Sequence, residues 1–382
     1  MTDPRIAIVS PGVGLVQRGY ERLFLDLFNL MRNDFDITLV KGGGPRKPDE
    51  IVPLFVHRNS GLVHALPVHK LSGRTPYHTE CLTFALGMLP YLRGGRFDIV
   101  HTIDPPLTRL LFRFRARLGL RFTLLYTDGA GMTPSDYPPA DHTQQIAQIW
   151  MDQALAYGYQ PSSMTLLPCG VYPERFDTPS DKATLRDAYG IDRDTFVILS
   201  VAAINRWHKR TDYLVDEVAR LDGKWLLLLD GSLDHGEPDL IAYARQKLGD
   251  RVRISQVPSD KVRELYKLAD VMAHAATFES FGLSIVEAAS TGLPVITHDG
   301  PHFRWLLPNP GSWIDASKTG AMTARLTDAM RDPAVLDAMR SAHVVRDRFS
   351  WHSLKAGYAA LYQHAASMPR RGVAEADCRR VA

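Results

Sequence analysis

The sequence is poor in cysteine and has no long apolar run. Three cysteines occur among 382 residues, and the positions of Cys81, Cys169 and Cys378 fit neither a metal site nor a disulfide framework. No stretch approaches the roughly eighteen consecutive apolar residues of a membrane-spanning helix, and no signal peptide is recognisable. We therefore expect a chain without membrane spans that works in a reducing, cytoplasmic compartment.

Charge of one sign is not in excess either. Lysine and arginine number 45, and aspartate and glutamate number 42, so the composition lacks the basic balance typical of nucleic-acid-binding proteins. Internal repeats and low-complexity tracts are also missing. What the chain does contain is 45% hydrophobic residues, arranged as apolar runs that alternate with helical patterns. This alternation predicts an α/β protein with a parallel sheet in each half, and the length allows two to three domains.

The most informative segment is residues 277–287, which read TFESFGLSIVE and place seven residues between Glu279 and Glu287. The apolar run before it, 270–276, predicts a buried parallel strand, and residues 284–290 predict a short helix. Both carboxylates then lie where a strand leads into a helix. That position is the carboxyl edge of a parallel sheet, where ligands bind.

The residue types in this segment suit a sugar bound through a phosphate. The backbone N–H groups of Phe281, Gly282 and Leu283 would point toward an anion at the start of the helix. Glu279, just before the helix, can accept hydrogen bonds from sugar hydroxyls, and Glu287 in its first turn can bind a ribose diol. An alternative is that Ser284 and Glu287 only form a capping box, which would leave Glu279 unexplained.

This segment resembles the Glu-x7-Glu signature of the retaining glycosyltransferases of family 4, which have the GT-B fold. The resemblance implies two Rossmann-like domains facing a cleft and a C-terminal helix that crosses back to the first domain. It also implies transfer of a sugar from a nucleotide-sugar, a UDP-sugar first and a GDP-sugar second, to an acceptor hydroxyl with retention of configuration. The acceptor would be a small molecule, a glycan or a lipid-linked molecule.

Other segments extend the resemblance over nearly the whole chain. Residues 166–176 resemble the family's connection between domains, and the polar run 177–188 marks the linker. The expected parts are an acceptor-side domain at 1–178, a nucleotide-sugar domain at 179–348, a crossover helix at 349–366 and a disordered tail at 367–382.

Three positions of the first domain are candidates for the site. Gly19 follows the first strand in a glycine-containing loop where the backbone could approach a diphosphate. Residues 97–105 (FDIVHTIDP) resemble a strand end of the family that faces the reacting sugar, so the resemblance assigns catalytic roles to His101 and Asp104. A structural histidine at the end of a buried strand is the alternative for His101. Asp128 stands where many relatives have a histidine.

In the second domain the loop at 204–212 resembles the family's basic loop, whose cations neutralise the donor diphosphate. Lys209 falls on the family's lysine, but Ala203 falls on its arginine, so Arg206 or Arg210 would supply the missing charge. A solvated turn is the alternative for this loop. Gly231 ends the next strand where the family has a glycine near the nucleotide.

The mechanism expected from these residues needs neither a metal nor another cofactor. Breaking the bond between a sugar and a diphosphate builds negative charge on the departing phosphate. Lys209, helped by Arg206, would stabilise that charge. No Asp-x-Asp cluster occurs in a suitable loop to hold a divalent ion.

Residues 107–118 raise the question of membrane contact. Arg109, Arg113 and Arg117 recur every four residues in an otherwise apolar helical pattern, and a basic amphipathic helix can lie on an anionic membrane. The alternative is a surface helix of the first domain with its apolar face on the sheet. Peripheral membrane contact is therefore one of two interpretations.

Other functions fit the sequence less well. A sugar-nucleotide epimerase or a phosphorylase shares the GT-B architecture but leaves the two glutamates unexplained. A Rossmann dehydrogenase would need a Gly-x-Gly-x-x-Gly loop after the first strand, which is missing. A GT-B-like binding protein without turnover remains an alternative because Ile103, Asp128 and Ala203 depart from the family pattern.

Overall fold

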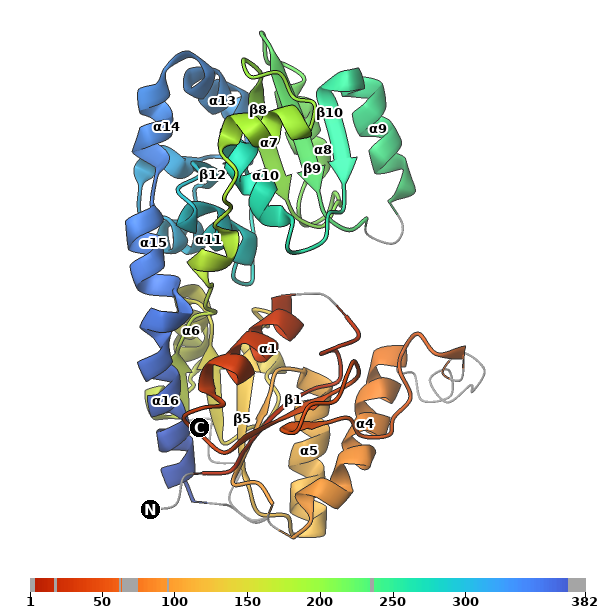
Figure 1. Cartoon of the computed structure of the whole chain (residues 1–382). Helices are drawn as coiled ribbons and strands as arrows, with labels where there is room; N and C mark the ends of the chain where they lie inside the picture. The colour runs from red at the N-terminus through yellow and green to blue at the C-terminus, as the bar shows by residue number, and fades with distance from the viewer. Residues whose placement is uncertain are drawn as a thin grey trace. The chain divides into compact units, whose positions relative to one another are not determined.

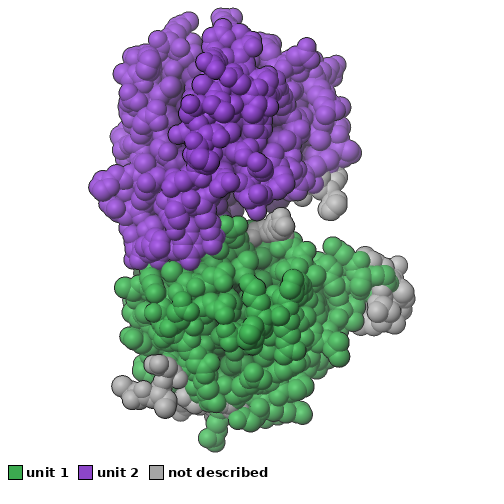
Figure 2. All heavy atoms as spheres, viewed as in Figure 1, with its two compact units in different colours: residues 1–169, 354–382 green, residues 170–353 purple. Residues whose placement is uncertain are grey.

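The computed structural model describes residues 4–16, 19–61, 63, 75–94, 96–233 and 237–369. The chain forms two compact units, one of Met1–Cys169 with Leu354–Ala382 and the other of Gly170–Ser353, which Figure 2 distinguishes by colour. Most of the predicted tail at 367–382 lies outside the described residues.

The described residues of the first unit form a parallel sheet of seven strands in the order β3-β2-β1-β4-β5-β6-β7, of which Figure 1 labels β1 and β5. Its strands are β1 (Ile6–Ser10), β2 (Ile37–Lys41), β3 (Glu50–Ile51), β4 (Ile99–Thr102), β5 (Thr123–Asp128), β6 (His142–Gln145) and β7 (Met164–Leu166). Its helices are α1 (Gly19–Met31), α4 (Pro76–Leu92), α5 (Pro105–Leu118), α6 (Gln148–Tyr157), η1 (Pro134–Asp136) and η2 (Pro161–Ser163).

In the part of the second unit that the structure describes, six strands form a parallel sheet in the order β10-β9-β8-β11-β12-β13. Its strands are β8 (Phe196–Val201), β9 (Trp225–Asp230), β10 (Val252–Ser255), β11 (Val271–Ala273), β12 (Val295–His298) and β13 (Trp313–Ile314). Its helices are η3 (Pro173–Phe176), α7 (Lys182–Ala188), α8 (Thr211–Val218), α9 (Pro238–Leu248), η4 (Gly249–Arg251), α10 (Val262–Leu268), α11 (Leu283–Ser290), α12 (Pro301–Leu306), η5 (Pro310–Ser312), α13 (Ala321–Arg331), α14 (Pro333–Met339) and α15 (Ala342–Phe349).

Most strands of both sheets are apolar on both faces, so helices must cover each sheet on two sides to keep these residues from water. Every residue of β1, β5 and β9 is buried, as expected for parallel strands between layers of helices. In the first unit, Phe84 of α4 and Leu111 of α5 pack with Val100 of β4 and Leu124 of β5 in one cluster. The prediction of two Rossmann-like parallel sheets is confirmed.

Each sheet has one point where the order of its strands reverses. The first strand of each unit, β1 or β8, has the second strand on one side and the fourth, β4 or β11, on the other. Loops that leave two such strands diverge to opposite faces of the sheet and open a crevice at its carboxyl edge. The topology therefore places a candidate site after β8 and β11, and a second one after β1 and β4.

The last helix, α16 (Trp351–Ser367), carries the chain from the second unit back into the first. Tyr358 and Tyr362 are fully buried in the first unit, and Lys355 forms an ion pair of 2.7 Å with Asp34. A helix was predicted at 349–366, and the structure has Phe349 at the end of α15 instead.

The division between the units also falls earlier than the predicted boundary after residue 178. It follows Cys169, because Val171 pairs with Ser350 in the second unit. Gly170 lies so close to Trp351 that a Cβ atom would come within 2.3 Å of the indole ring. Among the described residues, no helix combines the length and the apolar character needed to cross a membrane.

Candidate active site

The loops after β8 and β11 bring Lys209 and Glu279 together at the carboxyl edge of the second sheet. The two strands are direct neighbours, so residues 70 positions apart in sequence meet there. Asn205 shapes the first loop, because its buried Oδ1 accepts hydrogen bonds from the backbone N–H groups of His208 (3.1 Å) and Lys209 (2.7 Å). The basic loop and the first glutamate, which the sequence assigns to one site, therefore lie side by side, and their contacts with a donor stay a prediction.

Glu279 is a buried carboxylate with two hydrogen-bond donors on one oxygen. Lys209 Nζ forms an ion pair with Oε1, and His274 Nε2 donates to the same oxygen at 2.7 Å. Burial alone would raise the pKa of Glu279. The hydrogen bond and charge of His274, together with the Lys209 ammonium, outweigh it and lower the pKa to about 2. Glu279 is thus ionised and held in place near neutral pH.

His208 borders the other oxygen of this carboxylate. Its Nε2 donates to the carbonyl oxygen of Phe278 at 3.0 Å and lies 3.8 Å from Glu279 Oε2. Burial lowers the pKa of His208, and Lys209 lowers it further, so a neutral imidazole faces Oε2 at neutral pH. The hydrogen bonds to Glu279 described above both end on Oε1, which leaves Oε2 facing the neutral ring.

The turn into α11 depends on a glycine. Gly282 has a φ of 89° and is the N-cap residue, a conformation that is strained for residues with a Cβ atom. A glycine N-cap has no side chain with which to bond the first N–H groups of the helix. His302 Nε2 donates to the carbonyl oxygen of Phe281 at 2.9 Å and thereby fixes the turn.

Glu287 does not belong to a capping box. Helix α11 begins at Leu283 with Gly282 as its cap, so Ser284 is already inside the helix. Instead, Glu287 Oε2 accepts a hydrogen bond from the hydroxyl of Tyr266 on α10 at 3.0 Å. The capping-box alternative is wrong, and a neighbouring helix orients this half-buried carboxylate.

Arg206 does not join Glu279 and Lys209, which corrects its predicted role. Its guanidinium forms ion pairs with Glu237 (3.0 Å) and Asp239 (2.9 Å) at the start of α9. Two carboxylates therefore already neutralise it. Arg210 donates to the carbonyl oxygens of Ala316 (2.7 Å) and Ala275 (3.4 Å), so its guanidinium lies beside the loop that follows β11.

Gly231 marks a close approach of backbone at the same edge. It follows β9 with a φ of 156°, and a Cβ atom would lie 1.9 Å from the carbonyl oxygen of Ala202 after β8. Only glycine fits there, so the fold itself requires this residue. Its predicted contact with a nucleotide stays a prediction.

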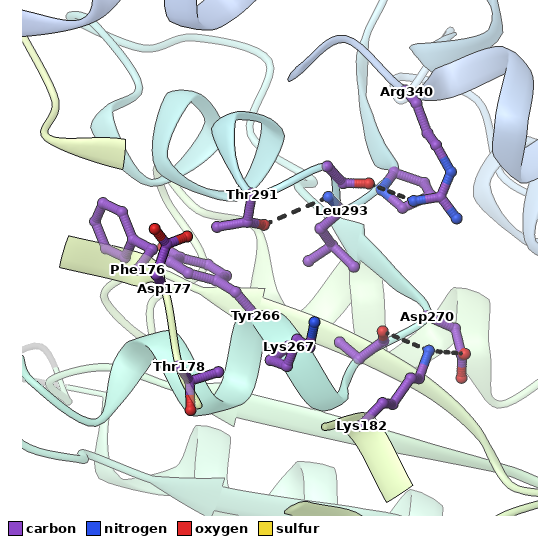
Figure 3. A pocket seen from close by; sticks show the side chains of 13 residues that line it. Phe176, Asp177, Thr178, Lys182, Tyr266, Lys267, Asp270, Thr291, Leu293 and Arg340 are labelled. Carbon is purple, nitrogen blue, oxygen red and sulfur yellow. Dashed lines mark hydrogen bonds and ion pairs between the residues drawn. The ribbon is translucent and has the colours of Figure 1, made fainter. Parts of the chain in front are cut away.

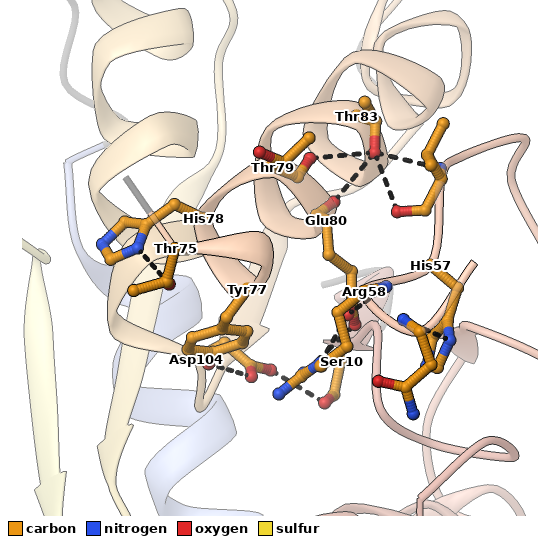
Figure 4. A network of polar contacts seen from close by, with 12 residues as sticks. Ser10, His57, Arg58, Thr75, Tyr77, His78, Thr79, Glu80, Thr83 and Asp104 are labelled. Atoms are coloured by element: carbon orange, nitrogen blue, oxygen red, sulfur yellow. Dashed lines mark hydrogen bonds and ion pairs between the residues drawn. The ribbon is translucent and has the colours of Figure 1, made fainter. Parts of the chain in front are cut away.

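In the first unit, Asp104 is held at the point where the strand order reverses. Its buried carboxylate accepts hydrogen bonds from Ser10 at the end of β1 (2.8 Å) and from the hydroxyl of Tyr77 (2.5 Å). Figure 4 shows the contacts of Asp104 with Tyr77 and Ser10, and the Arg58 guanidinium lies 4.2 Å from the centre of the Tyr77 ring. Arg58 in turn pairs with the fully buried Glu80.

His101, predicted to be catalytic, lies inside the first unit. Thr127 donates to Gln144 Oε1 (2.8 Å), so Thr127 must accept from His101 Nε2–H (2.7 Å). His101 Nδ1 then accepts from the Tyr362 hydroxyl (3.0 Å), and Gln144 donates to Tyr358 (2.9 Å). Both ring nitrogens are occupied and the side chain is 0% exposed. The structural alternative therefore holds: His101 anchors α16 to the sheet.

This burial gives a pH dependence that can be measured. Burial lowers the pKa of His101 to about 3, whereas the unfolded chain binds its proton near pH 6.5. Between those values only the unfolded state is protonated, so the stability of the first unit falls as the pH falls. From pH 7 to pH 5 the loss due to His101 is about 2 kcal/mol, at roughly 1.4 kcal/mol per pH unit below 6.5.

Amide hydrogen exchange in β4 and β5 measures this loss. We expect the free energy of opening to fall more between pH 7 and pH 5 in the wild type than in His101→Gln. Asp128, whose pKa burial raises to about 6, titrates with the opposite sign in both proteins and cancels in the difference. Equal pH dependence in the two proteins would contradict the buried network.

In the glycine-containing loop after β1, close packing requires Gly12 and Gly14 rather than Gly19, the position predicted to contact the donor. A Cβ atom on Gly14, which has a φ of 84°, would lie 2.1 Å from the carbonyl oxygen of Gly43, and one on Gly12 would lie 2.2 Å from Glu21 Oε1. Gly19 is the first residue of α1, and a Cβ atom there meets nothing within 4 Å. Packing therefore does not explain the glycine at position 19, and its donor contact stays a prediction.

Sequence patterns did not identify several of these partners. His274 interrupts the apolar run at 270–276, which was the available signal for a polar group at the end of β11. Tyr266 and Tyr77 had no such signal, because each lies on a helix that is distant in sequence from the carboxylate it binds. Among the described residues, no group of three or more His, Cys, Asp or Glu side chains is placed to hold a metal ion.

Known proteins resemble this chain in sequence over part of its length and in fold over nearly all of it. Residues 181–343 match the family described as "Glycosyl transferases group 1". The structure of sucrose-phosphate synthase from Thermosynechococcus elongatus superposes with a TM-score of 0.79 at 17% identity and covers 94% of this chain and 98% of that one. The structure of HepE from Anabaena in complex with UDP and glucose gives a TM-score of 0.74 at 16% identity, over 94% and 99% of the two chains.

The fold is GT-B. This confirms the fold class predicted from the sequence. The D-inositol 3-phosphate glycosyltransferase of Mycolicibacterium smegmatis is 27% identical over 198 residues, which is 50% of this chain and 45% of the relative. The chain thus spans about half the length of that relative, so the alignment describes the GT-B core only in part.

Proposed function

We propose that this protein is a retaining glycosyltransferase of the family 4 type. It would move a sugar from a nucleotide-sugar, a UDP-sugar in preference to a GDP-sugar, to an acceptor hydroxyl. The observation that carries the proposal is the buried, ionised Glu279, held by Lys209 and His274 at the carboxyl edge between β8 and β11. An open parallel sheet binds its ligands at this edge.

Glu279 and Glu287 would bind the two ends of the donor. Oxygen Oε2 of Glu279 would accept hydrogen bonds from hydroxyls of the transferred sugar, because His274 and Lys209 both occupy Oε1. Glu287, oriented by Tyr266, would accept from the ribose diol. A carboxylate that is already held in one orientation loses little further conformational entropy when it binds the donor.

The departing diphosphate would be stabilised by Lys209 and by the backbone. Negative charge builds on it in the transition state, and fixed donors stabilise such charge strongly where water is excluded. Lys209 lies beside Glu279, and the glycine-capped start of α11 presents backbone N–H groups. We propose that these groups suffice without a metal ion or another cofactor.

The comparisons favour a uridine nucleotide. HepE, which shares the fold, was solved with UDP and with UDP-glucose, and residues 181–343, which contain Lys209 and both glutamates, match a glycosyltransferase family. Asp104 at the edge of the first sheet is the proposed contact for the acceptor, which would be a small molecule, a glycan or a lipid-linked molecule.

A cytoplasmic location is part of this proposal. Cys81 and Cys169 are buried free thiols, which suits a reducing compartment. Peripheral membrane contact through α5 finds less support, because Phe112 and Phe114 pack against the core of the first unit and Arg115 is buried in an ion pair with Asp141. The arginines at 113 and 117 remain exposed.

Thermal unfolding with a panel of nucleotides tests the proposal. A bound ligand stabilises a protein by about 2.7 kcal/mol at a hundredfold excess over its Kd. We expect a UDP-sugar to raise the Tm, a GDP-sugar to raise it less, and NAD to leave it unchanged. Stabilisation by NAD alone would contradict the proposal, and hydrolysis of the bound nucleotide-sugar would exclude an inactive binding protein.

A further inference from the structure

The second unit has a cavity of about 410 Å³ at the opposite edge of its sheet from Glu279. Asp270 and Pro294 line it, and they directly precede β11 and β12. The cavity therefore lies at the amino ends of these strands, whereas Glu279 follows the carboxyl end of β11. Nothing in the proposed transfer reaction uses this cavity.

Cations from three separate elements line this cavity. Figure 3 shows Lys182 of α7, Lys267 of α10 and Arg340 after α14 around it. The Asp270 carboxylate is already paired twice, with Lys182 at 2.5 Å and with Arg186 at 2.6 Å. Arg340 donates to the carbonyl oxygen of Gly292 and forms an ion pair with an exposed carboxylate of α14.

One positive charge remains in excess at the cavity when Lys182, Arg186, Lys267 and Arg340 are counted against the carboxylates of Asp177, Asp270 and Asp337. Burial lowers the pKa of Lys182, and Arg186 and Arg340 lower it further, against the opposite effect of Asp270. Two cations near one ammonium group make the site favourable for an anion. Because the arginine and lysine side chains come from different elements, they surround a space rather than extend from one exposed face.

The remaining walls suit an organic molecule. The rings of Phe176 and Tyr266 meet edge to face with their centres 5.6 Å apart, and Leu293 adds apolar surface. Thr178 and Asp177 supply a hydroxyl and a carboxylate for polar groups. A volume of about 410 Å³ falls within the range of roughly 300 to 1,000 Å³ that is common for small-molecule sites.

We propose that this cavity binds a phosphorylated monosaccharide. The phosphate would lie against Lys182, Lys267 and Arg340, and the sugar ring against Phe176 and the small part of Tyr266 that borders the cavity. Asp177 and Thr178 would accept hydrogen bonds from sugar hydroxyls.

Tyr266 links this cavity to the candidate active site. Its ring lines the cavity, and its hydroxyl holds Glu287 Oε2 at 3.0 Å. A ligand that moves the ring changes the position of Glu287, so it would act as an effector of donor binding. This regulatory step rests on the proposed function, whereas binding to the cavity does not.

Calorimetric titration of the whole protein tests the binding. The probes are a hexose 6-phosphate, inorganic phosphate and the unphosphorylated hexose, at equal ionic strength. We expect the hexose 6-phosphate to bind most tightly and Lys267→Glu to weaken it at least about tenfold, as expected for the loss of a charged hydrogen-bond donor. Lys318→Glu, a control on an exposed lysine of the same unit, should leave the binding unchanged.

The donor site also contains a cation, so Lys209→Ala is the second control. Hexose phosphate should bind this variant as it binds the wild type. Binding that is lost in Lys209→Ala and kept in Lys267→Glu would overturn the proposal and place the anion at the donor site. Inorganic phosphate bound as tightly as the hexose phosphate would overturn the sugar part, and no saturable binding would overturn the whole.

The regulatory link is measured separately. Saturating hexose phosphate should change the Kd for UDP by at least about fivefold, the lower end of typical allosteric coupling. In Tyr266→Phe, which keeps the ring and removes the hydroxyl, hexose phosphate should still bind but the change in the UDP Kd should vanish. An unchanged effect in this variant would overturn the link. If UDP did not bind the wild type, the proposed function would fail while binding to the cavity could still be measured.

Discussion

Lys209→Ala is expected to lower kcat by roughly a hundredfold to a thousandfold, while EDTA leaves the wild type active. Removing one preorganised stabiliser of a developing charge typically costs about 2.7 to 4 kcal/mol. Lys209 is the cation beside Glu279, and Arg210 near the end of β11 offsets only part of its loss. Steady-state kinetics on protein treated with EDTA measures both effects.

The same loop supplies a matched control. The Arg206 side chain is held by two ion pairs, with Glu237 and Asp239. Arg206→Ala should therefore change kcat by less than about threefold. Lys209→Ala also removes a partner of a buried carboxylate and will lower stability, so kcat must be normalised to folded protein. Near-normal turnover in Lys209→Ala would show that this loop is only a solvated turn with no part in catalysis. Activity that EDTA abolishes and magnesium restores would contradict the metal-free proposal.

Glu279→Ala and Glu287→Ala are expected to affect different kinetic constants. Glu279→Ala should lower kcat by roughly ten- to a hundredfold, because a charged hydrogen bond near the reacting ring can strengthen as charge develops. Glu287→Ala should raise the Kd and the KM for the donor by a similar factor with a smaller change in kcat, because a ribose contact acts equally in the ground and transition states.

The pH profile gives this comparison a second readout. The pKa of Glu279 is about 2, so Glu279 stays ionised from pH 5 to pH 8 and should contribute no step to kcat in that range. An acid limb near pH 4 to 5 that disappears in Glu279→Gln would contradict the environment described for it. If both alanine variants lost only stability, with kinetic constants of the folded fraction unchanged, neither glutamate would contact the donor.

Local patterns predicted where the site lies better than how its side chains pair. Apolar runs separated by turn residues predicted both parallel sheets, and the order of strands then brought Lys209 and Glu279 to one edge. The partner that fixes Glu279, His274, was missed: it interrupts the apolar run at 270–276, but a single histidine after a short strand does not show which side chain it will bind. The hydrogen bond from Tyr266 to Glu287 depends on how α10 and α11 pack against each other. Local sequence patterns do not specify that packing.

Two predicted roles changed for the same physical reason. His101 and Arg206 both match positions where polar groups are useful, but the fold gives each of them closer partners. His101 is enclosed by Thr127 and Tyr362, and Arg206 is drawn to the carboxylates at the start of α9. A sequence shows which side chains are available near an edge, whereas competition among neighbours decides which of them face a ligand.

The most direct test of the central claim is the release of UDP from UDP-glucose by the wild type and by Glu279→Ala. The account predicts that the wild type accumulates UDP and that the variant, still folded, does so at least about tenfold more slowly. No binding or turnover of any nucleotide-sugar by the wild type, or equal rates in the two proteins, would contradict it.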